Sequence, residues 1–245
     1  SPTIFNYWFK KYNIKASYRY LELTEKNFHK KIKEVLEKKD TLGLNVTIPF
    51  KNKIIKHLNK IDTHAKKISA VNCVTNKKTI NGTNTDWTGY YKTLPNIKKT
   101  KNRKVVILGY GGASHAIHYV LKKRGFKDIL IFNRSKKKIK YTNKTEYTKT
   151  YNDLETHLEG AYLIINTTPT NPILKKHLSL ITKSTIVSDI VYSPKNTTFL
   201  KQFPKNKKIY GISMLIEQAK PCFKIWFGKN PSVDKKMLNT IYKKI

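Results

Sequence analysis

A glycine-rich turn set between two apolar segments constrains the fold of this chain more than any other feature. Residues 104–108 (Lys-Val-Val-Ile-Leu) form a short apolar run that predicts a buried strand, and a second run follows at residues 129–132. The turn 109–114 (Gly-Tyr-Gly-Gly-Ala-Ser) and a helical pattern to about Lys123 lie between the two runs. A strand, a turn, a helix and a second strand make a βαβ unit, in which the two strands run parallel.

Further strands are predicted after this unit. Short apolar runs at residues 162–166, 185–189 and 209–210 alternate with helical stretches. This alternation is typical of a doubly wound parallel sheet of the Rossmann type. From Ile212 the pattern is helical again, and a final helix is predicted from about Val233.

The first half of the chain mixes helices with short strands. A basic linker, residues 98–104, connects it to the βαβ unit. We therefore expect an α/β protein with two domains: a mixed α/β domain of residues 1–87, completed by helices in 212–245, and a Rossmann-type domain of residues 88–211. The elements predicted in the first half are a helix over 3–12, a strand over 18–23, a helix opened by Thr24 and running to about Lys38, a strand over 42–48 stopped by Pro49, a hairpin of 71–75 with 79–82, and a helix from about Asp86.

The glycine turn occupies the place of a phosphate cradle, after a strand and before a helix. Glycine lets the backbone turn tightly and approach a pyrophosphate group, which the N-terminus of the helix then stabilises. A glycine-rich turn can also serve steric needs alone, so the flanking βαβ unit is what supports cofactor binding. The candidates for dinucleotide binding are Gly109, Tyr110, Gly111, Gly112 and Ala113.

The end of the second strand indicates which dinucleotide would bind. An NAD-binding unit usually carries Asp or Glu there to hold the ribose 2′-hydroxyl. This chain instead has Asn133-Arg134-Ser135, followed by lysines at 136–138. Because Arg and Ser can bind a 2′-phosphate that a carboxylate would repel, the sequence favours NADP. The alternative interpretation is an exposed basic turn in a basic protein.

The net charge of +35 raises the question of a polyanionic partner such as nucleic acid. The lysines are scattered in twos and threes along the whole chain and form no single basic tail. We therefore expect no specific nucleic-acid partner. A positive field still attracts anionic small molecules, which suits a carboxylate substrate and a phosphate-bearing cofactor.

Other compositional features exclude several classes of protein. No run approaches the roughly 18 apolar residues that a membrane span needs. The two cysteines, Cys73 and Cys222, cannot form a disulfide framework, and neither has a metal-ligand spacing. We therefore expect a cytoplasmic protein with reduced thiols, no metal and no membrane partner.

Three further segments combine with the dinucleotide unit into a specific pattern. Taken singly they are unremarkable, because a lysine after a proline turn is usually solvated and Asn-Thr-Asp before a helix is usually a cap. In this order, with the glycine turn and Asn133-Arg134-Ser135, they resemble the shikimate dehydrogenase family, and the resemblance extends from the first residue to about Gly228. The segments are Asn45-Val46-Thr47-Ile48-Pro49-Phe50-Lys51, Ala70-Val71-Asn72 and Gly82-Thr83-Asn84-Thr85-Asp86-Trp87-Thr88-Gly89.

This resemblance implies an activity, the reduction of 3-dehydroshikimate to shikimate by NADPH in the shikimate pathway of aromatic amino-acid biosynthesis. Ketone reduction needs a hydride from the nicotinamide and a proton for the developing alkoxide. By resemblance, Lys51 is the proton donor and acceptor. Asp86 is implied as its hydrogen-bond partner, which also binds a ring hydroxyl of the substrate.

The resemblance also implies the remaining site residues and the roles of the two domains. The first domain would bind the small-molecule substrate and the second would bind NADP, and a homodimer is among the assemblies left open. The implied substrate contacts are Ser1, Thr47, Asn72, Asp86, Tyr192 and Gln218. The implied cofactor contacts are Gly109, Tyr110, Gly111, Gly112, Ala113, Asn133, Arg134, Ser135, Ile190 and Gly211.

The chain departs from the family pattern at a few positions. The family's carboxylate clamp is Ser-x-Ser-Pro preceded by a strand, and only the second serine is met here, as Ser1. We expect a version that carries this strand to be more stable and to bind shikimate more tightly. His115 stands where the family often has Arg, and Cys73 stands in place of Thr.

Two alternatives stay open at this point. One is a quinate/shikimate dehydrogenase or a related paralogue that uses NAD, against which Arg134 and Ser135 argue. The other is a basic nucleic-acid-binding protein on a decayed dehydrogenase scaffold. Decay should have removed Lys51 or Asp86, yet both are present.

Overall fold

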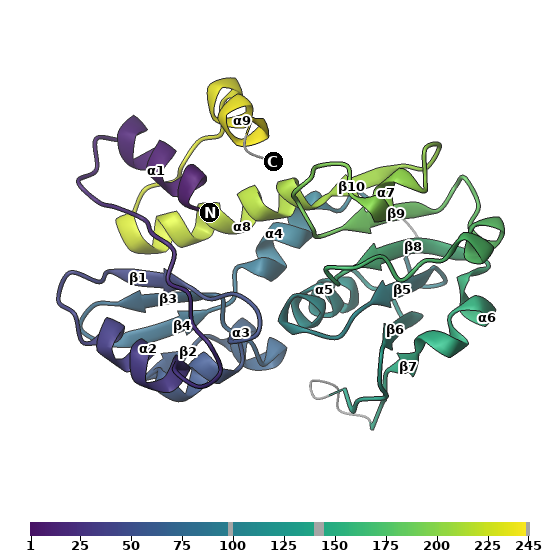
Figure 1. Ribbon diagram of the computed structural model, residues 1–245, viewed down its shortest axis with the longest axis horizontal. Coiled ribbons are helices and arrows are strands. Elements are labelled where there is room, and N and C mark those ends of the chain that lie inside the picture. The colour runs from purple at the N-terminus through teal and green to yellow at the C-terminus, as the bar shows by residue number, and fades with distance from the viewer. Residues whose placement is uncertain (98–99, 140–144, 244–245) are drawn as a thin grey trace.

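The computed structural model describes residues 1–97, 100–139 and 145–243, and it places two β-sheets side by side (Figure 1). We call residues 1–85 and 228–243, which contain the smaller sheet, the four-stranded unit, and residues 100–210 the six-stranded unit. Residues 98 and 99 of the predicted basic linker lie outside the described residues. The predicted α/β class with two domains is confirmed.

The larger sheet is the predicted doubly wound sheet. Its strand order is β10-β9-β8-β5-β6-β7, and these neighbours pair in parallel. The order reverses between β5 and β8, and in sheets of this kind ligands bind at that switch point, beyond the carboxyl ends of the strands. The strands are β5 (Lys104–Leu108), β6 (Ile129–Asn133), β7 (Lys149–Thr150), β8 (Ala161–Asn166), β9 (Ile186–Asp189) and β10 (Lys208–Tyr210).

Helices cover both faces of the six-stranded sheet. Val105 and Ile107 of β5 are buried on one face, and Val106 and Leu108 are buried on the other. Because both faces are covered, the central strands β5, β6 and β8 are apolar at nearly every position, and each is visible in the sequence as a continuous apolar run. The first face is covered by α4 (Asp86–Thr93), α5 (Gly112–Lys123) and α8 (Gly211–Phe227); the second is covered by α6 (Glu155–Leu158), α7 (Thr198–Lys201) and the 3-10 helices η2 (Tyr151–Asp153) and η3 (Lys175–Leu180).

The smaller sheet has the strand order β1-β3-β4-β2, and its β3 and β4 form the predicted hairpin. Helices pack on both of its faces, with Val74 buried on one face and Cys73 on the other. The strands are β1 (Gly43–Asn45), β2 (Lys60–Ile61), β3 (Cys73–Asn76) and β4 (Ile80–Thr83). The first face carries α2 (Phe28–Leu36), α3 (Thr63–Ile68) and the 3-10 helix η1 (Lys53–His57), and the second carries α1 (Pro2–Lys11), α9 (Lys235–Tyr242) and part of α8.

The predicted strand over residues 18–23 is wrong. Tyr18 instead stacks on Phe5 of α1 with the ring centroids 4.6 Å apart, and its hydroxyl donates to Asn45 Oδ1 over 2.8 Å. β1 is an edge strand that pairs with β3 alone among the described strands, and residues 18–23 form no ladder with its free edge. Alternation of apolar and polar residues makes a strand only where a neighbouring strand supplies hydrogen-bond partners.

Other differences lie at the ends of elements. The helix expected to open at Thr24 begins at Phe28, because Thr24 and Asn27 exchange hydrogen bonds between backbone N–H and side-chain oxygen in the turn before it. The strand expected over 42–48 is confined to β1. The final helix begins at Lys235 because Asp234 caps it, accepting a hydrogen bond from the Met237 N–H.

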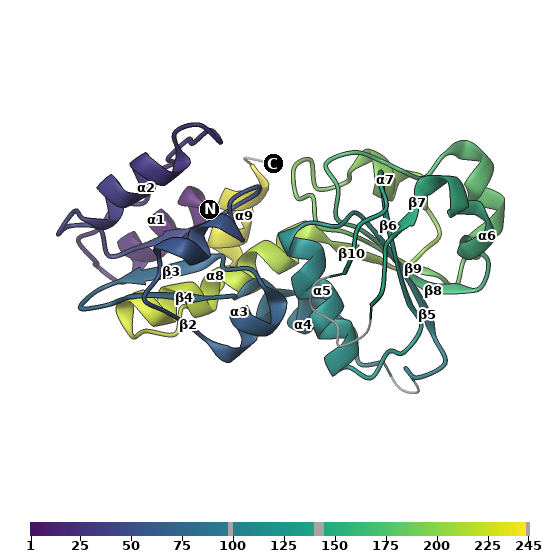
Figure 2. The ribbon, with the colours of Figure 1, turned by 90° about the horizontal axis from the view of Figure 1, so that it is seen from below.

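Helices α4 and α8 cross each other between the two sheets, as both views show (Figure 2). Gly89 lies at this crossing, where a Cβ would be 2.8 Å from the Met214 carbonyl oxygen and 2.9 Å from the Gln218 backbone nitrogen. The predicted domain boundaries at 87/88 and 211/212 stay a prediction, and both fall inside these two helices. In the described ranges, no helix is long and apolar enough to cross a bilayer.

Replacing Gly89 by alanine tests how tightly this joint is packed. Alanine favours a helix over glycine by about 1 kcal/mol, but overpacking costs about 1–3 kcal/mol, so we expect Gly89→Ala to lower the melting temperature. Thr88→Ala, at the neighbouring half-buried position, is the matched control and should not lower it. A melting temperature of Gly89→Ala equal to that of the wild type would show that the crossing can relax.

Candidate active site

Lys51 is held in place by the backbone around it. Phe50, the residue before it, is buried and stacks on Phe28 of α2 with centroids 4.3 Å apart. The Lys51 carbonyl accepts a hydrogen bond from the Val71 N–H over 2.8 Å, which ties this turn to the start of the hairpin. The side chain can therefore extend from a fixed point.

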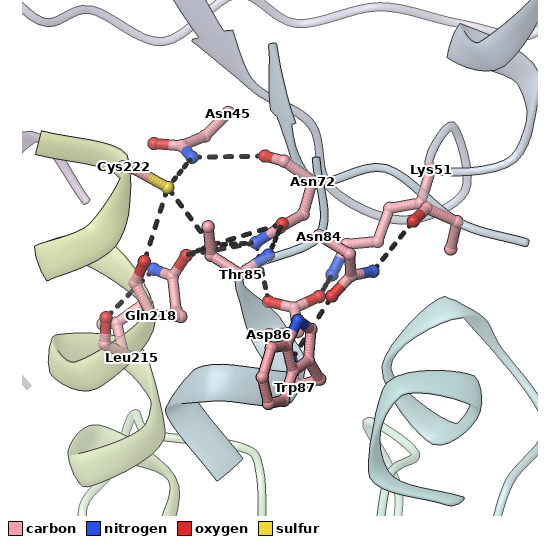
Figure 3. Close-up of polar contacts among 11 residues, drawn as sticks. Asn45, Lys51, Asn72, Asn84, Thr85, Asp86, Trp87, Leu215, Gln218 and Cys222 are labelled. Carbon is pink, nitrogen blue, oxygen red and sulfur yellow. Dashed lines mark hydrogen bonds and ion pairs between the residues drawn. The ribbon is translucent and has the colours of Figure 1, made fainter. Parts of the chain in front are cut away.

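Asp86 is the first residue of α4, and its carboxylate meets the Lys51 ammonium (Figure 3). Lys51 Nζ lies 2.6 Å from Asp86 Oδ2, and the two side chains are 16% and 7% exposed. A carboxylate in the first turn of a helix is stabilised by the positive end of the helix dipole. The sequence-predicted pair is thus in contact and shielded from water.

Asn72 connects this pair to the rest of the site. Its Nδ2 donates to Asp86 Oδ1 over 2.9 Å and lies 3.2 Å from Gln218 Oε1, while its Oδ1 accepts the Thr85 N–H over 2.6 Å. All four residues are buried. Asn72, Asp86 and Gln218 were predicted to bind one substrate, and they share one hydrogen-bonded network.

Two further residues of this network, Asn45 and Cys222, were not predicted as part of the site. Cys222 Sγ lies 3.2 Å from both Asn45 Nδ2 and Thr85 Oγ1, and Asn45 Nδ2 also donates to the Asn72 carbonyl. Burial raises the pKa of the neighbouring Cys73 thiol, so that thiol stays protonated at neutral pH. The signals were present in the sequence, because Asn45 belongs to the Asn-Val-Thr segment and Cys222 follows Gln218 by one helical turn.

The glycine turn has the geometry of a phosphate cradle. Gly109 has φ +104°, and a Cβ there would lie 2.5 Å from Thr167 Oγ1, so glycine is required at this position. Gly111 is the N-cap of α5 and has no side-chain cap, and no atom lies within 4 Å of the place where its Cβ would be. The first N–H groups of α5 are thus not taken up by a side-chain cap, which leaves them for a pyrophosphate.

The turn after β6 lies beside this cradle. Tyr110, within the glycine turn, donates a hydrogen bond from its hydroxyl to the Lys138 carbonyl over 3.2 Å. Asn133 Nδ2 donates to the Ser135 carbonyl, which shapes the turn, and the side chains of Arg134 and Ser135 are exposed. An exposed guanidinium and hydroxyl at this point can bind a 2′-phosphate, so the residues present fit NADP.

Ile190 and Gly211 lie together at the carboxyl ends of β9 and β10. A Cβ on Gly211 would be 2.4 Å from the Ile190 carbonyl oxygen, so the two backbones touch. Asp189 holds the loop that carries Ile190, accepting hydrogen bonds from Val191 N–H at 3.0 Å and Thr197 Oγ1 at 2.6 Å. Burial raises the pKa of this carboxyl.

Three predicted substrate contacts lie outside this hydrogen-bonded network: Ser1, Thr47 and Tyr192. Ser1 is the half-buried N-cap of α1. Thr47 is exposed, and Tyr192 is 36% exposed. In the described part of the chain, none of the three donates to or accepts from Lys51, Asp86 or Asn72.

The two halves of the site meet at Lys51. A Cβ on Gly112, the first residue of α5, would lie 3.0 Å from Lys51 Cδ. The aliphatic part of the lysine therefore packs on the glycine turn, while its ammonium reaches Asp86. This arrangement places an ammonium group and its carboxylate partner beside the glycine turn.

Comparison with known proteins identifies related sequences. A family model described as the shikimate dehydrogenase substrate binding domain matches residues 1–74, and one described as shikimate / quinate 5-dehydrogenase matches residues 92–202. The shikimate dehydrogenase (NADP(+)) of Staphylococcus haemolyticus (strain JCSC1435) is 36% identical over 242 residues, which cover 95% of this chain and 90% of that protein.

Solved structures resemble the chain over its whole length. Shikimate dehydrogenase 1 from Peptoclostridium difficile matches with a TM-score of 0.85 at 29% identity, covering 99% of this chain and 92% of that one. A shikimate dehydrogenase in complex with NADP+ matches with a TM-score of 0.81 at 29% identity, covering 100% of this chain and 90% of that one.

Replacing Asn72 by leucine tests the network. The change removes the acceptor of the Thr85 N–H and the donor to Asp86 Oδ1, while Asp86 Oδ2 keeps its contact with Lys51. Each buried hydrogen bond lost in this way costs about 1–3 kcal/mol. We expect Asn72→Leu to lower the free energy of unfolding measured in urea by at least that amount. Asn239→Leu, at an exposed position of α9, is the control and should change it little; equal stabilities for the two variants would argue against a tightly coupled network.

Proposed function

Because this chain belongs to the shikimate dehydrogenase family, we propose that Lys51 and Asp86 carry the proton transfer of its reaction, the NADPH-dependent reduction of 3-dehydroshikimate to shikimate. The observation that carries this proposal is the buried 2.6 Å contact between Lys51 Nζ and Asp86 Oδ2 beside the glycine turn. The enzyme is an oxidoreductase of the shikimate pathway, and its cofactor is NADP.

Lys51 acts as the general acid in the direction of reduction. An ammonium group has three protons to donate, and the contact with Asp86 uses one of them. The others are available to the substrate oxygen, which becomes an alkoxide as the carbonyl is reduced. In the reverse direction the neutral amine accepts the proton from the hydroxyl.

Asp86 orients the lysine and binds the substrate. Its Oδ2 holds Lys51, and its Oδ1 accepts from Asn72, so the carboxylate cannot rotate freely. Fixing the donor in this way lowers the barrier by removing the entropy of its orientation. A ring hydroxyl beside this carboxylate completes the set of partners.

Polar residues around the pair would hold the remaining groups of the substrate. Asn72 directly precedes β3, and Gln218 lies on α8. The two side chains are hydrogen-bonded to each other, and Gln218 also donates to the Leu215 carbonyl. Ser1, Thr47 and Tyr192 would contact the carboxylate or hydroxyls from the exposed side. The net charge of +35 favours the approach of an anionic substrate.

The nucleotide would lie along the carboxyl ends of the six-stranded sheet. Bound there, NADPH supplies the hydride. The first N–H groups of α5 would hold the pyrophosphate, Asn133, Arg134 and Ser135 the adenosine end, and Ile190 and Gly211 the nicotinamide end. The packing of Gly112 on Lys51 would put the proton donor beside the pyrophosphate site.

Replacing Lys51 by alanine tests the proton transfer. We expect kcat of shikimate-dependent NADP+ reduction, followed spectrophotometrically, to fall about 10²-fold to 10⁴-fold, the contribution usual for a general acid or base. Lys53→Ala is the matched control, since Lys53 pairs with Glu25 at the surface, and its kcat should be unchanged. Full activity in Lys51→Ala would contradict the role of the lysine in proton transfer. Turnover of quinate in place of shikimate by the wild type would contradict the assigned substrate.

Replacing Arg134 by alanine tests the contact with the 2′-phosphate. A charge-assisted hydrogen bond contributes about 1.5–3 kcal/mol, so we expect the Michaelis constant for NADPH to rise about 10-fold to 100-fold. The constant for NADH should not change. Arg103→Ala, which removes a guanidinium stacked on Tyr162, is the control and should leave both constants unchanged; equal losses with NADPH and NADH would contradict the assignment.

The cytoplasmic location remains a proposal, supported by two buried free thiols that suit a reducing compartment. The homodimer and the absence of a nucleic-acid partner stay predictions from the sequence.

A further inference from the structure

One face of α5 lies against the four-stranded unit along most of the helix. Gly112, Ala116, Tyr119 and Lys123 recur at intervals of four, three and four residues, which places them in one stripe on a helix. Both ribbon views show α5 beside α3, and the two helices are in contact (Figure 2). The helix that begins at the nucleotide cradle is thus also the element that docks onto the other unit.

The beginning and the middle of the stripe make small apolar contacts. Gly112 packs on the stem of Lys51. One turn later, Ala116 joins Ile68 and Ala70 in a buried cluster that bridges the two units. Such contacts are non-directional, because burial of apolar surface depends on area and not on orientation.

The third position supplies a directional contact. The Tyr119 hydroxyl lies 2.7 Å from Nδ1 of His64 on α3, a hydrogen bond between the two units. The His64 ring packs against the Trp87 ring at a tilt of 32° with centroids 4.5 Å apart, and Trp87 meets the Tyr119 ring edge-on at 5.9 Å. Trp87 directly follows Asp86 in α4, so this cluster adjoins the residue that holds Lys51.

We propose that His64 and Tyr119 are positioning residues that hold the cofactor cradle and the Lys51–Asp86 pair at their reactive separation. This inference rests on the proposed function. Both residues lie outside the glycine turn, and Tyr119 lies about 10 Å along the helix from Gly112 at 1.5 Å per residue. A hydrogen bond at that distance fixes the rotation of α5, and a small rotation would move Gly112 relative to Lys51.

Each ligand would still bind when this hydrogen bond is lost. The residues proposed to bind shikimate and those proposed to bind the dinucleotide phosphates are not altered by the loss. What changes is the alignment of the two halves, on which hydride transfer depends. The contact should therefore affect kcat more than the binding of either ligand alone.

The kinetic test uses Tyr119→Phe, which keeps the aromatic ring and removes only the hydroxyl. We expect kcat for shikimate oxidation to fall about threefold to tenfold, the range for one net hydrogen bond, with unchanged dissociation constants for NADP+ alone and for shikimate alone. Tyr162→Phe, in the six-stranded unit and away from α3, is the control with wild-type values. An unchanged kcat, or a kcat loss matched by weaker binding of each ligand alone, would overturn the proposal.

A double variant separates positioning from general destabilisation. His64→Phe and Tyr119→Phe should each lower kcat, and the double variant should lose no more than either single one, because both remove the same hydrogen bond. If the kcat losses of the two single variants multiply in the double variant, the two side chains act independently, and the proposed shared role of this hydrogen bond is overturned.

Fluorescence gives a readout that needs no turnover. Of the three tryptophans, Trp8 and Trp226 are buried, at 0% and 6% exposure, so iodide quenching reports mainly on half-buried Trp87. We expect a higher quenching constant in Tyr119→Phe than in the wild type or Tyr162→Phe. No change would overturn the inference even if the wild type did not oxidise shikimate, and that failure would count against the proposed function alone.

Discussion

The ion pair between Lys51 and Asp86 is the interaction on which the arrangement of the site depends, because it joins the four-stranded unit to α4. Removing two charges from water costs several kcal/mol for each ion, and the attraction between them offsets this cost only when the remaining lone pairs are satisfied. Here the second carboxylate oxygen accepts from Asn72, and the carboxylate lies in the first turn of α4. Asn72 is in turn held by the Thr85 N–H, so the hairpin, α4 and α8 must meet for the pair to persist.

Much of the fold could be predicted because burial on both faces leaves a plain signal. The strands β5, β6 and β8 are apolar at nearly every position, and the structure places them and β9 within a residue of the prediction. The segment 18–23 alternates as a strand does, yet it lies without a partner strand among the described residues, and alternation does not contain that information. The short elements β2, α3 and β7 were missed, because two to six residues give too few turns or alternations to detect a period.

The site was predictable to the extent that its residues stand in ordered motifs. Lys51, Asn72, Asp86 and Gln218 come from four separate segments, and the structure brings them into one network. Their individual surroundings could not be read in advance, since Asn45 and Cys222 take part through contacts that depend on how α8 lies on β3. The same is true of Gly112 against Lys51, because the approach of the two units is set by packing and not by local pattern.

The helix α8 begins at Gly211, directly after the last strand of the six-stranded sheet, and ends beneath the other sheet, where Trp226 donates to the Val74 carbonyl. Between these ends it supplies Gln218 to the site. The six-stranded unit therefore cannot be exchanged between proteins on its own. The helix α8 that follows its last strand also forms part of the hydrophobic core of the four-stranded unit. Recombination between distant relatives would have to carry both halves together, and an insertion of one residue within α8 would turn Gln218 by about 100° away from its partners.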